Sequence, residues 1–397
     1  MTGEKDPSVE ARMRLILFTM AGIGFASAMP IRCLDPVLPQ IAKEFAISDH
    51  DAAYAAVAFG LPFALVQPFL GPVADLFGKL KMIKVCVFTL ALMLLASALA
   101  PSFWSLIVIR VFQGVASGGI FPISLALVSD IVPVKQRQVL ASRIMATTLT
   151  GNVLGATVGG VIGDFAGWRT TMLLLFVLIF IAGGLGAYSL RGIKAKPKKF
   201  ELANLARSYT TIFRNPISYI CYPVTFLEGI CVFGILPFVA TLLAQQGEPR
   251  YSVAGLLLGC FALGGVIYAM SVTHLLRFLR ERGVILFGGL LMASQLFIFG
   301  VSVPWQYEIA GFLALGWGLY MYHGTIQIYV TEIAPDFRAT AVALYATAVF
   351  LGQAVGIMIY GQLLDTIDRV PTLFAGGITI LLCAVVASAL LRNRERD

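Results

Sequence analysis

Long apolar runs alternate with short polar connections along the whole chain. A helix needs about 20 apolar residues to cross the hydrocarbon core of a bilayer, and most of these runs have that length. Because lipid offers no partner to free backbone groups, runs of this kind predict an all-α polytopic membrane protein. Twelve spans are predicted, at residues 14–40, 50–70, 82–100, 104–129, 140–162, 170–190, 216–240, 252–273, 284–302, 307–330, 339–363 and 371–391.

The far part of the first span breaks the apolar pattern. Arg32 and Asp35 lie three positions apart, which places them on one face of a helix, between Pro30, Pro36 and Pro39. Proline kinks a helix and frees backbone groups, and a charge at membrane depth normally faces a bundle interior or a wet cavity. We therefore predict a functional site here. The alternative is an Arg–Asp pair that neutralises itself and reaches water at the outer interface.

Composition and charge support the membrane assignment. The chain is 58% hydrophobic and 13% charged, whereas soluble domains carry about 25% charged residues. The net charge of +8 follows the topology, because most of the 29 Lys and Arg fall in connections on one side. By the positive-inside rule this side is cytoplasmic, with both termini, and we expect a cell membrane of the bacterial inner-membrane type. The opposite side holds only Lys43, Arg169, Arg250 and Arg369.

The chain is predicted to contain two similar halves. A basic connection at 191–215 separates six spans at 1–190 from six at 216–397. Gly151-x-x-x-Gly155 in the fifth span recurs as Gly352-x-x-x-Gly356 in the eleventh, and Arg137 and Arg338 precede these glycines at the same spacing. Duplicated halves are typical of transporters, whose substrate site lies between the halves near the membrane midplane.

Three motifs resemble those of a known family. The loop Gly71-Pro-Val-Ala-Asp75-Leu-Phe-Gly78-Lys79 resembles the signature loop of the major facilitator superfamily. Arg110-Val-Phe-Gln113-Gly114 resembles the family's fourth-span motif. The glycine row of the fifth span resembles the motif associated with antiporters, although Ala156 replaces its usual proline. Leu34–Pro39 and Gly167-Trp-Arg169 are typical of the drug-efflux branch.

The resemblance implies two six-helix bundles around a central cavity that opens alternately to either side. The loop after the eighth span, 274–282, keeps its positive charge but lacks the glycine and aspartate, so we expect the cytoplasmic gate to depend on Asp75. Small residues at every fourth position let helices approach closely, so the glycine rows are expected to be packing or rocking seams. The gating and conformational candidates are Gly71, Asp75, Gly78, Lys79, Arg137, Gly155, Gly159, Arg338, Gly352 and Gly356.

Asp35, Arg32 and Arg110 are the main candidates for the central site. Arg110 and Asp35 lie at similar depth, about 10 Å from the outer ends of their spans at 1.5 Å per residue. Opposite charges favour an ionised Asp35 and burial favours its neutral form, so its protonation is expected to depend on which side is open. This dependence is what proton coupling requires. The alternative for Arg110 is a structural role that holds the first and fourth spans together.

Other polar residues in the spans are further candidates. Glu228 is a second possible coupling carboxylate if it faces inward, and otherwise makes an interhelical hydrogen bond. Aromatic residues with polar tips suit flat, apolar or cationic ligands, although such a stripe more often packs, and a lone histidine is more often a satisfied core residue. The substrate-binding candidates are Gln67, Gln113, Trp317, Tyr320, His323 and Gln327.

The expected function is proton-coupled export of small apolar or amphipathic compounds by alternating access. The alternative is proton-linked transport of a specific small organic anion or metabolite. A receptor or membrane enzyme is disfavoured because the sequence contains no catalytic, metal-binding or nucleotide-binding constellation. The expected partners are a small-molecule substrate and the bilayer, with no nucleic acid, metal or cofactor, and a monomer suffices.

Overall fold

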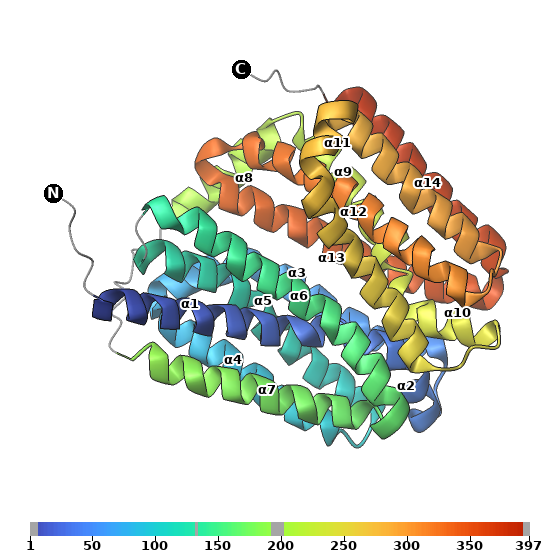
Figure 1. The fold of residues 1–397 in the computed structure, drawn as a ribbon, viewed down its shortest axis with the longest axis horizontal. Coiled ribbons are helices and arrows are strands. Elements are labelled where there is room, and N and C mark those ends of the chain that lie inside the picture. The colour runs from blue at the N-terminus through green and yellow to red at the C-terminus, as the bar shows by residue number, and fades with distance from the viewer. Residues whose placement is uncertain (1–6, 132–133, 192–201, 392–397) are drawn as a thin grey trace.

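The computed structural model describes residues 7–131, 134–191 and 202–391, which are helical with no strand (Figure 1). The α-helices are α1 (Pro7–Ala28), α2 (Leu38–Phe45), α3 (Asp49–Phe77), α4 (Lys79–Ala98), α5 (Phe103–Ile131), α6 (Val134–Ala166), α7 (Trp168–Ser189), α8 (Leu202–Arg214), α9 (Ser218–Glu228), α10 (Val239–Gln245), α11 (Tyr251–Gly300), α12 (Trp305–Ile333), α13 (Arg338–Thr366) and α14 (Arg369–Leu390). Short 3₁₀ turns are η1 (Met29–Ile31), η2 (Asp35–Val37), η4 (Leu236–Phe238) and η5 (Pro335–Phe337), and η3 (Gly229–Phe233) is a π-helical turn.

The predicted all-α, multi-pass architecture is confirmed. In the described part of the chain, seven segments are long and apolar enough to cross a membrane, and the remaining predicted spans also coincide with helices. The eighth and ninth spans both lie in α11, where Arg280 (φ 54°, ψ 178°) interrupts the helix between them. The seven segments are Lys79–Ala98, Phe103–Leu127, Trp168–Ser189, Ser218–Gln245, Tyr251–Gly300, Thr340–Thr366 and Arg369–Leu390.

The first and seventh spans are both broken. In the first, α1 gives way to η1 and η2 before α2 begins, and each of these three elements has a proline in its first two positions. In the seventh, α9 continues into the π-helical turn η3, then η4 and α10. The proline-induced break predicted for the first span is therefore present, and a matching break occurs in the other half.

Two bundles form the molecule, an N-terminal bundle of α1–α7 and a C-terminal bundle of α9–α14 (Figure 1). Glycines pack the broken span of each bundle against a neighbouring helix. A Cβ on Gly151 or Gly155 of α6 would collide with the carbonyl oxygens of Phe25 and Met29, in or next to α1. In the second bundle, Gly352 and Gly356 of α13 approach the carbonyls of Phe226 and Ile230 in the same way. These contacts repeat at an offset of about 200 positions, as duplicated transporter halves require.

The two bundles meet along two helix pairs, α6 with α11 and α3 with α13. At the first, Gly160 lies against the backbone at Tyr251 and Gly255. At the second, the rings of Phe63 and Phe350 are 4.7 Å apart in an edge-to-face arrangement. At Gly160, the lack of a side chain allows the backbones of α6 and α11 to approach closely in lipid.

Polar contacts also close the end of the molecule at which α2 and α10 lie, here called the α2/α10 end. Asp164 of α6 accepts hydrogen bonds from the backbone N–H groups of Tyr251 and Ser252, at 2.8 and 2.7 Å, and so caps α11 of the other bundle. Thr241 donates to Asp49 at 2.8 Å. His50 lies 3.5 Å from Asp365, which follows Gly356 by nine positions just as Asp164 follows Gly155. These contacts join the two bundles at this end.

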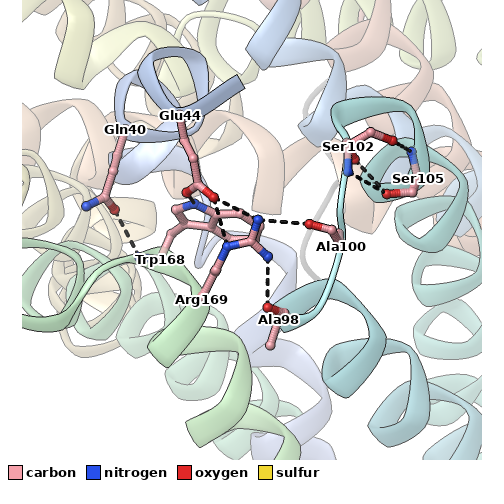
Figure 2. A network of polar contacts seen from close by, with 8 residues as sticks. All are labelled: Gln40, Glu44, Ala98, Ala100, Ser102, Ser105, Trp168 and Arg169. Carbon is pink, nitrogen blue, oxygen red and sulfur yellow. Dashed lines mark hydrogen bonds and ion pairs between the residues drawn. The ribbon is translucent and has the colours of Figure 1, made fainter. Parts of the chain in front are cut away.

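The broken first span is anchored at the same end by α2 (Figure 2). Arg169, at the start of α7, pairs with Glu44 at 2.7 Å and donates to the carbonyls of Ala98 and Ala100. The indole of Trp168 also donates to Glu44, at 2.6 Å. In the second bundle, Arg369 at the start of α14 donates to the carbonyls of Leu242 and Phe299. In each bundle, an arginine at the start of the sixth span thus binds backbone carbonyls near the ends of neighbouring spans.

The structure places some of the gating candidates. Gly78 adopts φ +93°, which a glycine permits, and separates α3 from α4. Lys79 is buried and Arg338 is exposed. The side chains at Gly71, Asp75 and Arg137 lie outside the described residues. In the 191–215 connection, α8 is helical, and 192–201 also lie outside the described residues.

Candidate functional site

A cavity of about 220 Å³ lies between the two bundles. Along α6, α11 and α13, the cavity begins next to the contacts that join the bundles at the α2/α10 end. Most of its surface is apolar and aromatic, and both broken spans contribute to it. The lining residues are Arg32, Asn152, Val153, Ala156, Phe233, Leu236, Leu258, Phe261, Ala262, Leu319, Tyr320, His323, Gln327, Tyr345, Ala346, Val349 and Phe350.

Arg32 and Asp35 form a buried ion pair at the cavity wall. Arg32 Nη1 donates to Asp35 Oδ2 at 3.1 Å, and the guanidinium also reaches Gln353 of the other bundle at 3.4 Å. It lies 5.1 Å from the ring centre of Phe233, in the broken seventh span. Arg32 lines the cavity, whereas Asp35 is 1% exposed and lies behind it. Through Arg32, the pair therefore links the cavity wall to side chains of both bundles.

Arg110 binds backbone and holds helices of the N-terminal bundle together. Its guanidinium donates to the carbonyls of Ala55 and Pro30, at 3.1 and 3.2 Å, and to the side chain of Gln113 at 2.9 Å. Gln113 continues the network to Ser97 of α4 at 2.8 Å. Arg110 is completely buried and is not among the residues that line the cavity. This geometry is that of the structural alternative considered for Arg110.

Glu228 and His323 form a second buried pair, from α9 and α12. His323 Nδ1 is 3.0 Å from Glu228 Oε1, and Glu228 has no exposed surface. Glu228 Oε2 is buried without a hydrogen-bond partner among the described residues. His323 lines the cavity and packs against the ring of Tyr345, 4.7 Å away between ring centres. As with Arg32 and Asp35, the basic partner faces the cavity and the carboxylate lies behind.

The remaining binding candidates divide into two groups. Tyr320 and Gln327 line the cavity on the same face of α12 as His323. Trp317 instead donates to Ser271 at 3.2 Å and packs edge-to-face on Phe287. Gln113 is buried in the Arg110 network, and Gln67 is half-buried outside the cavity lining.

Two polar residues at the cavity were missed in the sequence. Asn152 lines the cavity, and Gln353 bonds Arg32. Both directly follow a glycine that the internal repeat aligns, Gly151 and Gly352. Extending the comparison of the two halves by one residue beyond these glycines would have indicated both side chains.

The cavity, the duplicated bundles and the broken spans are features of a transporter core, and comparison with known proteins gives the family. The family model described as Major Facilitator Superfamily matches residues 20–277 and 221–397. The chain belongs to this superfamily. The resemblance of the motifs to the superfamily is thereby confirmed, and the superfamily member is a transporter rather than an enzyme.

Individual relatives are distant but cover nearly the whole chain. An uncharacterized MFS-type transporter, YfhI of Bacillus subtilis (strain 168), is 24% identical over 99% of this chain and 96% of its own length. Multidrug resistance protein 2 of the same organism is 22% identical, and the alignment covers 94% of each chain. The crystal structure of a D-xylose-proton symporter has a TM-score of 0.76 at 14% identity, over 94% of this chain and 96% of that one. The solved structure supports the fold alone.

Proposed function

We propose that this superfamily member is a proton-coupled exporter of small apolar or amphipathic compounds, with Asp35 as a coupling carboxylate. The observation that carries the proposal is the buried Arg32–Asp35 pair at the wall of a mostly aromatic cavity between the bundles. A carboxylate in this position would meet a different environment when the cavity opens to the other side of the membrane. Similarity to a multidrug resistance protein supports the substrate class.

The alternating step would open the α2/α10 end and close the opposite one. With cytoplasmic termini, the contacts at the α2/α10 end would close the cavity to the outside in this state. Substrate would enter the cavity from the cytoplasm and displace the proton held near Asp35. Opening to the outside would then let the carboxylate regain a proton from the more acidic side.

Transport by purified protein in liposomes under an imposed pH gradient tests this proposal. We expect flux of an amphipathic substrate to follow the gradient in the wild type. In Asp35→Asn, which keeps an oxygen for Arg32, we expect substrate binding without gradient-driven flux. Asp368→Asn is the matched control, because Asp368 is exposed at the start of α14. Normal, pH-dependent flux in Asp35→Asn would show that Asp35 has only a structural role.

The second candidate function, transport of a small organic anion, has one observation in its favour. In both buried pairs the basic side chain, Arg32 or His323, is the partner that lines the cavity. A substrate carboxylate would find two basic side chains there. Flux and binding of an organic anion in preference to a lipophilic cation would favour this alternative.

A further inference from the structure

The Glu228–His323 pair has a geometry that the coupling role of Asp35 does not use. Glu228 is enclosed, and its hydrogen bond to His323 Nδ1 is the contact that orients the imidazole. The side chain of His323 keeps 22% of its surface exposed. The ring is further held by Tyr345, which packs against it and donates its hydroxyl to the His323 carbonyl at 2.8 Å.

This arrangement fixes which ring nitrogen is available to the cavity. An ionised carboxylate only accepts hydrogen bonds, so a contact with Glu228 places a proton on Nδ1. In the neutral imidazole the lone pair is then on Nε2. Nε2 has no hydrogen-bond partner among the described residues, and His323 is part of the cavity wall. The cavity therefore contains one oriented, basic acceptor atom.

The charge of the Glu228–His323 pair is set by its own protonation, because the ionisable groups around it are uncharged. The ionisable groups around Glu228 are phenols and thiols, which are uncharged near neutral pH in water. They come from the helices packed around it and are Tyr322 of α12, Tyr345 of α13, Cys221 of α9, Cys231 of η3 and Cys383 of α14. Across the cavity, Arg32 is the fixed cation and is matched by Asp35.

We propose that His323 Nε2 is a second proton site, in addition to Asp35, and that a hydrogen-bond donor of the substrate competes with the proton for its lone pair. The inference rests on the proposed export function and names its substrate class. That class is an apolar or aromatic body carrying an N–H donor, of which an alkylammonium is the best case. Direct competition of this kind produces antiport, because binding one ligand releases the other.

The charges of the cavity agree with this class. With Arg32 and Asp35 balanced, the cavity is neutral when the Glu228–His323 pair holds its extra proton, and it carries one negative charge when that proton is lost. A monocation that replaces the proton restores neutrality. An anion would instead bind with the proton, and the two would move together. The aromatic side chains of the lining, such as Phe233 and Tyr320, suit an ammonium with an apolar body.

Equilibrium binding to purified protein in detergent tests the inference with two matched probes. These are 2-phenylethylammonium and its N,N,N-trimethyl analogue, which keeps the charge but has no N–H donor. We expect the affinity for the first probe to rise with pH by at most about tenfold per pH unit, the limit for one-proton competition, and protons to be released on binding in weak buffer. We expect a shallower slope for the trimethyl analogue.

Variants test whether the pH dependence of binding arises from the Glu228–His323 pair. His323→Gln keeps an acceptor oxygen but has no proton site, so the difference in pH slope between the two probes should vanish while binding remains. His274→Gln, at an exposed position of α11, should keep the wild-type difference in slope. Glu228→Gln removes the buried charge and should weaken binding of both probes.

Three results would overturn the inference: equal slopes for the two probes, a wild-type difference in slope in His323→Gln, or no binding of the ammonium at millimolar concentration. Because the test needs no transport, it separates the two proposals. A difference in slope that depends on His323 without gradient-driven flux would contradict the export function alone. Gradient-driven flux with an unchanged difference in slope in His323→Gln would contradict the second proton site alone.

Discussion

At the scale of single residues, the two arginines of the first bundle have different roles. Arg32 reaches the cavity and Gln353 of the other bundle, whereas Arg110 donates through Nε and Nη1 to carbonyls and Gln113 within its own bundle. A guanidinium supplies several donors in a fixed planar fork, which a lysine ammonium cannot reproduce. Arg110 is therefore expected to determine stability more than substrate specificity.

Replacing Arg110 by lysine should destabilise the protein. The variant keeps the charge but leaves at least one of the carbonyls of Ala55 and Pro30 without its donor in a buried site. The expected loss is about 1–3 kcal/mol of unfolding free energy. Thermal unfolding in detergent measures it, as a lower transition temperature. Arg250→Lys, at an exposed pair with Glu248, is the control and should unfold like the wild type. Equal stability of Arg110→Lys would contradict the role assigned here.

Residue pairs were the least predictable part of the site. Glu228 and His323 could each be singled out as polar residues in apolar spans, but their contact joins helices 95 positions apart and depends on how α9 and α12 face each other. The same limit applies to Arg110. Its distance from the outer end of the span could be read from the sequence, but the direction of its guanidinium could not.

At the scale of elements, proline and glycine patterns carried most of the predictable structure. Pro30, Pro36 and Pro39 indicated the break in the first span, because their effect on the backbone is local. The corresponding break in the seventh span includes a π-helical turn at Gly229–Phe233, which has no proline within it. The available signals for this second break were Pro237 at the start of η4 and the repeat, in which Gly151 and Gly155 recur as Gly352 and Gly356.

Adding one methyl group tests the close approach of α6 to the broken first span. Gly155→Ala places a Cβ against the Met29 carbonyl, which neither backbone can avoid without moving. We expect a loss of about 1–3 kcal/mol in stability, as in other overpacked sites, and reduced flux. Gly22→Ala is the control, since no atom lies within 4 Å of the added Cβ. Unfolding temperatures in detergent compare the two variants, and equal values would show that this contact tolerates a side chain.

At the scale of the whole molecule, the two bundles are joined at the α2/α10 end, by different chemistry on the two sides. Asp164 caps backbone donors of α11, while its repeat counterpart Asp365 faces the imidazole of His50. The repeat places Asp164 and Asp365 at equivalent positions but does not specify their partners. Alternating access requires that all of these contacts separate together.

A disulfide across this end should block transport. Asp49 and Thr241 belong to different bundles and their side chains are in hydrogen-bond contact. In the double variant Asp49→Cys, Thr241→Cys, oxidation should form a crosslink and reduce flux at least about tenfold, and a reductant should restore it. The six native cysteines are buried, and each single-cysteine variant serves as a control. Full flux in the crosslinked protein would mean that this end does not open during transport.

The cap on α11 links the opening of the molecule to hydration. The N–H groups of Tyr251 and Ser252 are held by a carboxylate of the opposite bundle, and at the first turn of a helix they have no other partner on the backbone. When the bundles separate, water must take the place of Asp164 on these donors and must also solvate the freed carboxylate. The open state therefore binds more water than the closed state at this end. Osmolytes that lower the activity of water should shift the protein toward its closed form, so that the rate of turnover responds to osmotic strength as well as to pH.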